Sequence, residues 1–240
     1  MVGDEHRAET LRALRQLCRG TARRTQSDER PRLSMGIPSL DALLPHRGLE
    51  CGSLVEWLVP VEGSGASILA LQGVRATLDR QQVWAVVDAT GEFHAPAVQG
   101  WGISLESLLL LRTSSVADAL WTVEQCLRCP AIGITWFHAE HLHDREVQRW
   151  KIASESGNGL GVLFRPVTAA RQASWADVRW RVQPRPTLTN EGHRVRVELI
   201  SCRGAFAGGS VELDVNDATG NVRLVSTVAG AATAVRAAGA

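Results

Sequence analysis

Lysine is nearly absent from this chain of 240 residues, in which Lys151 is the only one. No segment in the first 150 residues can therefore use a lysine of its own. Tyrosine is absent altogether, although there are eight tryptophans. Of these, Trp57, Trp84 and Trp136 fall on expected strands, which predicts that they fill the core.

Long apolar runs are absent too. No run reaches the roughly 18 residues that span a bilayer, and the first thirty residues lack the apolar segment of a secretory signal. A net charge of +1 excludes a global attraction to nucleic acid or membranes. The five cysteines are odd in number and lie in apolar or helical contexts, which favours a reducing compartment over a disulfide scaffold. We therefore expect a cytoplasmic protein.

The first 24 residues predict an amphipathic helix, because leucines recur near helical spacing and arginines gather at its end. This helix is a candidate for docking on a partner, through Arg7, Leu11, Leu14 and Arg15. A solvated helix face and a contact with DNA phosphates remain alternatives. Residues 25–32 are polar and predict a linker, residues 33–229 a core, and residues 230–240 a disordered tail.

The core alternates apolar strands with helices, which predicts an α/β fold with a mainly parallel sheet and helices on both faces. The expected strands are 53–59, 81–88, 107–112, 131–137 and 159–166, and the expected helices are 64–80, 115–129 and 145–156. From residue 177 the apolar residues alternate with period two, in 177–184, 193–202 and 210–215. This second pattern predicts antiparallel strands at the C-terminal edge of the sheet.

The stretch VEGSGASILAL, which begins at residue 61, has the form of a glycine-rich loop that leads into a helix. A working phosphate loop carries G-x-x-x-x-G-K-[ST], in which lysine reaches the phosphates and the hydroxyl holds Mg²⁺. Here Gly63, Ser64 and Gly65 keep the loop and Ser67 keeps the hydroxyl, but Ala66 stands at the lysine position. Because charge-assisted contacts are the strong ones, we expect weak or absent nucleotide binding and very little hydrolysis.

The run MGIPSLDALLPHRGLECGSLVEWLVPVEGSGAS resembles the start of the RecA-type ATPase core, the RecA-like P-loop NTPase fold. The rest of the chain resembles the ImuA family in the order of four segments, which are VVDATGEFHAPAVQGWGI, LLLLRTSSVADALWTVEQCLRC, GNGLGVLFRP and VRVELISCRGAFAGG. This resemblance implies a role in SOS-induced translesion synthesis, through contact with RecA and an ImuB-like polymerase relative and, indirectly, with an error-prone DnaE-type polymerase. It also implies a cytoplasmic location, at the nucleoid when DNA is damaged.

A second departure from RecA concerns Mg²⁺. The strand that carries a metal-binding carboxylate in RecA corresponds here to AIGITWFHAEHL, with Phe137 near the expected position and Glu140 three residues later. The two losses predict that the protein is not an enzyme and uses no cofactor beyond weak ATP and Mg²⁺ binding. A low-turnover RecA-family ATPase and a SulA-like inhibitor of cell division are the alternatives.

Other polar groups receive structural interpretations. Asp88 and Glu92 follow the second strand and favour capping over catalysis. Cys126 and Cys129, together with nearby histidines, have the residue types of a zinc site. Their spacing nevertheless favours packed thiols and no metal.

The segments at the positions of the RecA DNA-binding loops, HAEHLHDRE and PVTAARQASWAD, carry few basic residues. We therefore expect no strong autonomous DNA binding. Trp175 and Trp180, which lie beside arginines, are expected at a protein interface.

Overall fold

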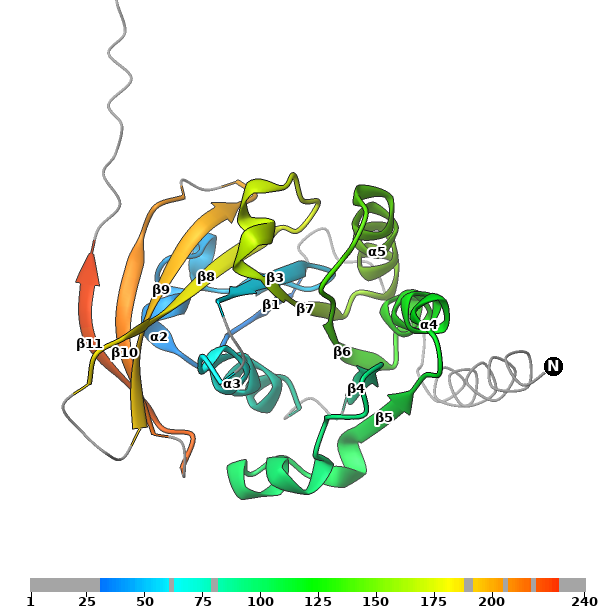
Figure 1. The fold of residues 1–240 in the computed structure, drawn as a ribbon, viewed down its shortest axis with the longest axis horizontal. Helices are drawn as coiled ribbons and strands as arrows, with labels where there is room; N and C mark the ends of the chain where they lie inside the picture. The colour runs from blue at the N-terminus through cyan, green and yellow to red at the C-terminus, as the bar shows by residue number, and fades with distance from the viewer. Residues whose placement is uncertain are drawn as a thin grey trace, which may run out of the picture.

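The computed structural model describes residues 31–60, 63–78, 82–187, 192–204, 207–216 and 219–228, and it has a mixed α/β architecture (Figure 1). Its main sheet has nine strands in the order β11-β10-β9-β8-β3-β7-β6-β4-β5. The pairs among β8, β3, β7, β6, β4 and β5 are all parallel, whereas β8 to β11 pair antiparallel. The sheet is therefore mostly parallel, with an antiparallel C-terminal edge.

The parallel half follows the expected alternation closely. Its strands are β3 (Leu54–Val59), β4 (Val83–Asp88), β5 (Leu108–Arg112), β6 (Ile132–His138) and β7 (Leu160–Pro166). Its helices are α3 (Ala66–Leu78), α4 (Val116–Arg128) and α5 (Asp144–Gly157). The apolar side of α3 packs into one core cluster, and α4 and α5 pack into the other, so helices cover both faces of the sheet (Figure 1).

The antiparallel half consists of β8 (Val178–Arg185), β9 (Gly192–Cys202), β10 (Ser210–Asn216) and β11 (Val222–Val228). Valines and leucines that alternate along β9 and β10 are buried in the same cluster as α3. Burial of every second residue is what the period-two sequence pattern predicts for strands with one face in the core.

The remaining elements are short. β1 (Arg32–Leu33) and β2 (Leu49–Glu50) form a small antiparallel pair, with α2 (Pro38–Asp41) and the 3₁₀ turn η1 (Pro45–Arg47) between them. The further 3₁₀ helices are η2 (Ala95–Trp101), η3 (Leu105–Ser107) and η4 (Val167–Arg171). Arg32, assigned to the linker from the sequence, already lies in β1. The expected N-terminal helix and C-terminal tail lie outside the described residues.

The three tryptophans expected in the core are there, since Trp57, Trp84 and Trp136 are at most 2% exposed. Lys151 is also buried, and it connects α5 to the residues at the start of β3 and β8. Its Nζ donates to Asp177 Oδ2 at 2.6 Å and pairs with Glu155 at 3.0 Å. Asp177 in turn accepts the backbone N–H of Leu54, at the first residue of β3.

Candidate functional site

The glycine-rich loop lies between the carboxyl end of β3 and the start of α3, where α/β sheets bind ligands. Gly63 and Gly65 have φ angles of +72° and +81°, a left-handed conformation that side chains disfavour. The carbonyl of Gly65 accepts the N–H of Leu69 at 3.1 Å, so the loop runs directly into the helix. The backbone therefore has the loop-to-helix connection that the sequence predicts.

The side chains of this loop do not replace the missing cation. Ala66, at the lysine position, is 2% exposed, and its methyl group belongs to the core cluster around α3. Ser64 is buried and Ser67 is half-buried. What the described loop offers an anion is thus backbone N–H groups and the helix dipole, which contribute about 1 kcal/mol or less.

A histidine from a distant strand lies against this loop. A Cβ atom placed on Gly65 would be 2.1 Å from Nε2 of His193, which belongs to β9. The imidazole therefore occupies the space beside Gly65, and a Cβ there would force the ring or the loop to shift. Sequence reasoning missed His193, because nothing local signals that a strand some 130 residues later reaches the loop.

At the carboxyl end of β4, Asp88 caps a turn. Its carboxylate accepts the backbone N–H groups of Gly91, Glu92 and Phe93 at 2.8 to 3.2 Å. Arg112 lies 3.7 Å from the same carboxylate. The capping role predicted for Asp88 is confirmed, and its oxygens are already engaged by the protein itself.

Near the end of β6, Phe137 stands where the resemblance to RecA-type ATPases implies a metal-binding carboxylate. Phe137 is buried and meets Trp150 edge to face, with ring centroids 5.4 Å apart. His138 is exposed as a residue, but its ring stacks on Phe164 at 4.5 Å. Desolvation of this ring lowers the pKa of His138, although Asp88 and Glu92 raise it in part. Glu140 is exposed and, among the described contacts, makes no ion pair.

The segment after β7 is held by a buried charge cluster. Glu56 is fully buried on β3 and pairs with Arg165 of β7 and Arg179 of β8, of which Arg165 lies at 3.0 Å. Arg165 also donates to Gln172 Oε1 at 2.6 Å, and Arg179 donates to the carbonyl oxygens of Ala169 and Gln172. Arg165 and Arg179 therefore fix η4 and Gln172 to the sheet and are used inside the protein, whereas Arg171 of η4 is exposed.

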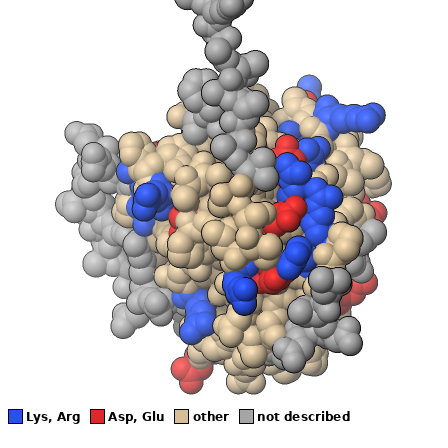
Figure 2. Space-filling view, turned by 90° about the vertical axis from the view of Figure 1, so that its left-hand side faces the viewer, with Lys and Arg blue, Asp and Glu red and all other residues tan. Residues whose placement is uncertain are grey.

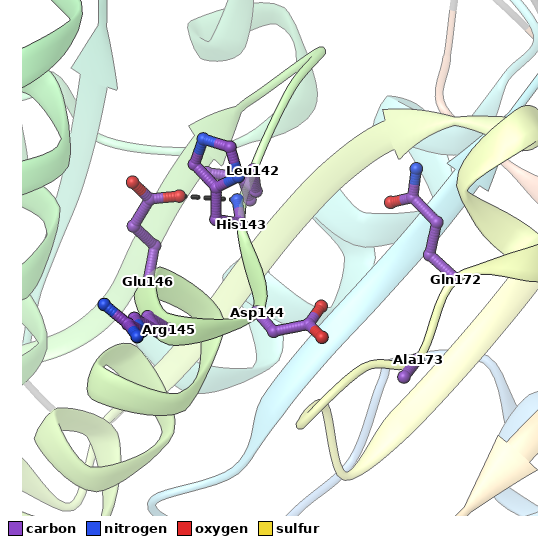
Figure 3. Close-up of a pocket in the computed structure, with 7 residues that line it drawn as sticks. All are labelled: Leu142, His143, Asp144, Arg145, Glu146, Gln172 and Ala173. Atoms are coloured by element: carbon purple, nitrogen blue, oxygen red, sulfur yellow. Dashed lines mark hydrogen bonds between the residues drawn. The ribbon is translucent and has the colours of Figure 1, made fainter.

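A pocket of about 720 Å³ separates this segment from the start of α5 (Figure 3). It is lined by Gln172 and Ala173 on one side and by Leu142, His143, Asp144, Arg145 and Glu146 on the other. The N–H of His143 donates to Glu146 Oε2 at 2.6 Å, which caps the helix. Figure 3 shows the carboxylate of Asp144 extending toward the side of Gln172. The lining mixes both charge signs.

The docking candidates meet different outcomes. Arg7, Leu11, Leu14 and Arg15 lie outside the described residues. Trp175 is 44% exposed and can meet a partner. Trp180 is 0% exposed, and its ring lies 6.1 Å from that of Trp57. Trp180 thus lacks the accessible surface that was expected of it, because it lies on the core-facing side of β8.

The cysteine pair behaves as packed side chains. Cys126 and Cys129 are 0% and 4% exposed, and burial raises the pKa of Cys126. Within the described part of the chain, no three His, Cys, Asp or Glu residues are arranged to hold a metal ion. None of the described helices combines the length and apolar character of a membrane span.

Comparisons with known proteins give two kinds of relative, and no protein-family model matches the chain. Protein ImuA of Caulobacter vibrioides is 28% identical over 203 residues, which covers 75% of this chain and 82% of that protein. Protein RecA of Chloroherpeton thalassium is 35% identical over 104 residues, or 43% of this chain and 29% of RecA. Protein RecA of a Synechocystis species is 34% identical over 102 residues. The expected resemblance is therefore confirmed: the chain is similar to ImuA over most of its length and to RecA over a part.

Proposed function

We propose that this protein is a non-catalytic, RecA-like adaptor of the ImuA type that acts in SOS-induced translesion synthesis. In this role it contacts an ImuB-like polymerase relative and RecA, and through them an error-prone DnaE-type polymerase. Its work is to hold proteins together at damaged DNA, without nucleotide hydrolysis and without strong DNA binding of its own.

The observation that carries this proposal is the state of the loop after β3. The loop has two glycines with positive φ at the start of a helix, but Ala66 is buried in the core where a cation is needed, and His193 lies against Gly65. Phe137 fills the core where a metal-binding carboxylate is needed. An ATPase needs both the cation and the metal, so the fold supports a role that depends on surfaces rather than on this site.

The fixed segment after β7 supports the absence of strong DNA binding. A strand of DNA is held by several free cations and by stacking platforms. Arg165 and Arg179 are instead buried with Glu56, which leaves Arg171 as the one exposed arginine of the segment. Trp175 stands exposed in the same segment and is available to a protein partner.

A complementation experiment tests the proposal in the host. Deleting the gene should lower damage-induced mutation, and the wild-type chain should restore it. Ser67→Ala should restore it equally, because the adaptor does not use the loop hydroxyl. Loss of complementation by Ser67→Ala, in a variant that folds normally, would contradict a non-catalytic role.

Partner contact is tested with purified proteins. Size exclusion with light scattering should give a complex when the chain is mixed with the host's ImuB-like protein or RecA. If the chain forms a complex with neither protein, the adaptor mechanism is wrong.

The preserved glycine conformations favour one alternative, a low-turnover ATPase whose missing cation comes from a neighbouring subunit. In that case the complex, but not the single chain, should hydrolyse ATP with Mg²⁺. Ser67→Ala should then abolish the turnover, whereas the adaptor proposal expects no turnover in either sample.

A further inference from the structure

β11 is an edge strand that leaves apolar side chains exposed. It pairs with β10 on one side, and no other described strand pairs with it. Leu224 and Val225 are 47% and 39% exposed. Open strand edges are places where a further strand can add, and proteins that use them as binding sites leave them uncovered.

The backbone groups that face the open edge follow from the pairing. The N–H of Asn216 donates to the carbonyl of Asn221 at 2.9 Å, so these two residues form a hydrogen-bonded pair. Antiparallel pairs alternate, which makes Asp214 and Arg223 the next hydrogen-bonded pair. The backbone groups of Val222 and Leu224 consequently point away from β10, toward the open edge.

On the core-facing side of this edge lies a pocket of about 370 Å³. Its lining combines β11 with the residues around the start of α2 and one residue of α3: Gly36, Ile37, Pro38, Ser39, Gln72, Asn221, Val222 and Leu224. Gln72 Nε2 donates to the carbonyl of Gly220 at 2.7 Å, which fixes the turn before β11. The pocket can therefore receive an apolar side chain from a strand placed beside Leu224.

The opposite face of the same strands is basic. Five arginines on β8, β9 and β11 share this face with three carboxylates on β9 and β10. The arginines are Arg181, Arg185, Arg194, Arg196 and Arg223, and the carboxylates are Glu198, Glu212 and Asp214. Figure 2 shows a column of basic side chains with acidic ones between them. Each carboxylate pairs with one arginine: Arg181 with Glu198, Arg185 with Glu212, and Arg194 with Asp214. Arg196 and Arg223 make no ion pair among the described residues and carry the excess charge. The hydrogen bond from Arg194 lowers the pKa of Asp214, and Arg223 helps to lower it.

We propose that β11 binds an extended, acidic segment of another protein, which adds to the sheet as a tenth strand. Its acidic side chains lie beside Arg223 on the basic face, and its apolar side chains, which alternate with them, enter the pocket beside Leu224. This inference goes beyond the proposed function, because it names a surface and the chemistry of its partner and holds whichever protein supplies the segment.

Charge selects this occupant over two others. A second copy of the chain would bring the same excess of arginine to the edge, so like charges would meet. A nucleic acid would place phosphates beside Glu198, Glu212 and Asp214, and it gains little from arginines that are already paired. An acidic strand brings its carboxylates to Arg223 at the edge and keeps the backbone pairing.

The test supplies the segment at high effective concentration. A strand of alternating Glu and Val is fused after Ala240 through a flexible Gly-Ser linker, and the control fusion carries the same residues in two blocks. Amide hydrogen exchange of residues 219–228 should be at least about tenfold slower in the alternating fusion. Equal exchange in the two fusions would overturn the proposal.

Variants then assign the effect to the surface. Arg223→Glu and Leu224→Asp should each remove the difference between the fusions. Arg145→Glu, which makes the same charge change at an exposed position of α5, should leave it intact. Unfolding curves of each variant show whether the fold survives.

The other occupants give different results. A dimer of the unfused chain that Arg223→Glu dissociates would assign the edge to a second copy. Binding of a fluorescein-labelled single-stranded oligonucleotide that Arg196→Glu abolishes would assign the face to nucleic acid. Either result would contradict the proposal.

Discussion

His193 and Gly65 are in such close contact that a Cβ on the glycine would lie 2.1 Å from Nε2 of the histidine. The two residues come from β9 and from the loop after β3. Their contact joins the antiparallel half of the sheet to the loop where a nucleotide would bind in a phosphate-loop ATPase.

Gly65→Ala should therefore destabilise the protein by about 1–3 kcal/mol from backbone strain, with the collision adding to this cost. Gly63→Ala is the matched control, because its φ is also positive but, among the described residues, nothing beyond its chain neighbours lies within 4 Å of its Cβ position. In a His193→Ala background, Gly65→Ala should cost about as much as Gly63→Ala. Urea unfolding measures all four variants, and an unchanged cost in that background would show that the collision is unimportant.

Replacing Lys151 should cost far more than replacing a surface base. Lys151→Met removes the buried partner of Asp177, which keeps only the exposed Arg203 at 3.4 Å, and should lower the free energy of unfolding by about 3 kcal/mol. The control is Arg32→Met, whose ion pair with Glu50 is 3.6 Å long and exposed, and it should cost about 1 kcal/mol or less. Chemical denaturation compares the two, and similar costs would refute the structural role of Lys151.

Acidification should weaken the fold through His138. Desolvation lowers its pKa below the ordinary value of 6.5, so the unfolded chain binds a proton more readily than the folded one. The stabilising contribution is present above pH 6.5 and is lost as the pH falls through and below that value. His138→Gln should therefore lose less stability than wild type between about pH 7.5 and 5.5. Nuclear magnetic resonance titration of the His138 ring checks the pKa directly, and a value above 6.5 would reverse the expectation.

The cysteines should differ in how fast they react with iodoacetamide. Cys126 is buried, and its raised pKa disfavours the thiolate, so iodoacetamide should leave it unmodified in the folded protein. Cys202 is half-buried with a raised pKa and should react slowly. Mass spectrometry locates the label, and unfolded protein serves as the positive control.

Elemental analysis of the same sample should find substoichiometric zinc, whereas one zinc per chain would favour the metal cluster instead.

The sequence predicted the strands and helices of the core well, because their apolar periods are local signals. It identified Trp57 and Trp84 as core residues for the same reason. It failed for Trp180, where flanking arginines suggested an interface. Alternation along β8 puts Arg179 and Arg181 on one face and Trp180 on the other. The residues directly before and after a strand residue therefore indicate the environment of the opposite face, and not the environment of that residue.

The candidate site shows where local reasoning stops. The loop from Gly63 to Ser67 could be identified from its glycines and its hydroxyl. The contact of His193 with Gly65 could not, because it depends on how four antiparallel strands extend the sheet. The buried cluster of Glu56, Arg165 and Arg179 was missed for a similar reason, since those three residues are brought together only by the pairing of β3 with β7 and β8.

The burial of Lys151 also limits which reagents and enzymes can act on the folded chain. Because it is the only lysine and is 6% exposed, reagents that acylate amines have no accessible side chain among the described residues. A lysine-specific protease can cut the chain at a single place, in the middle of α5. The rate of that one cleavage thus reports how often α5 opens, by itself or with the whole fold, without any engineered probe.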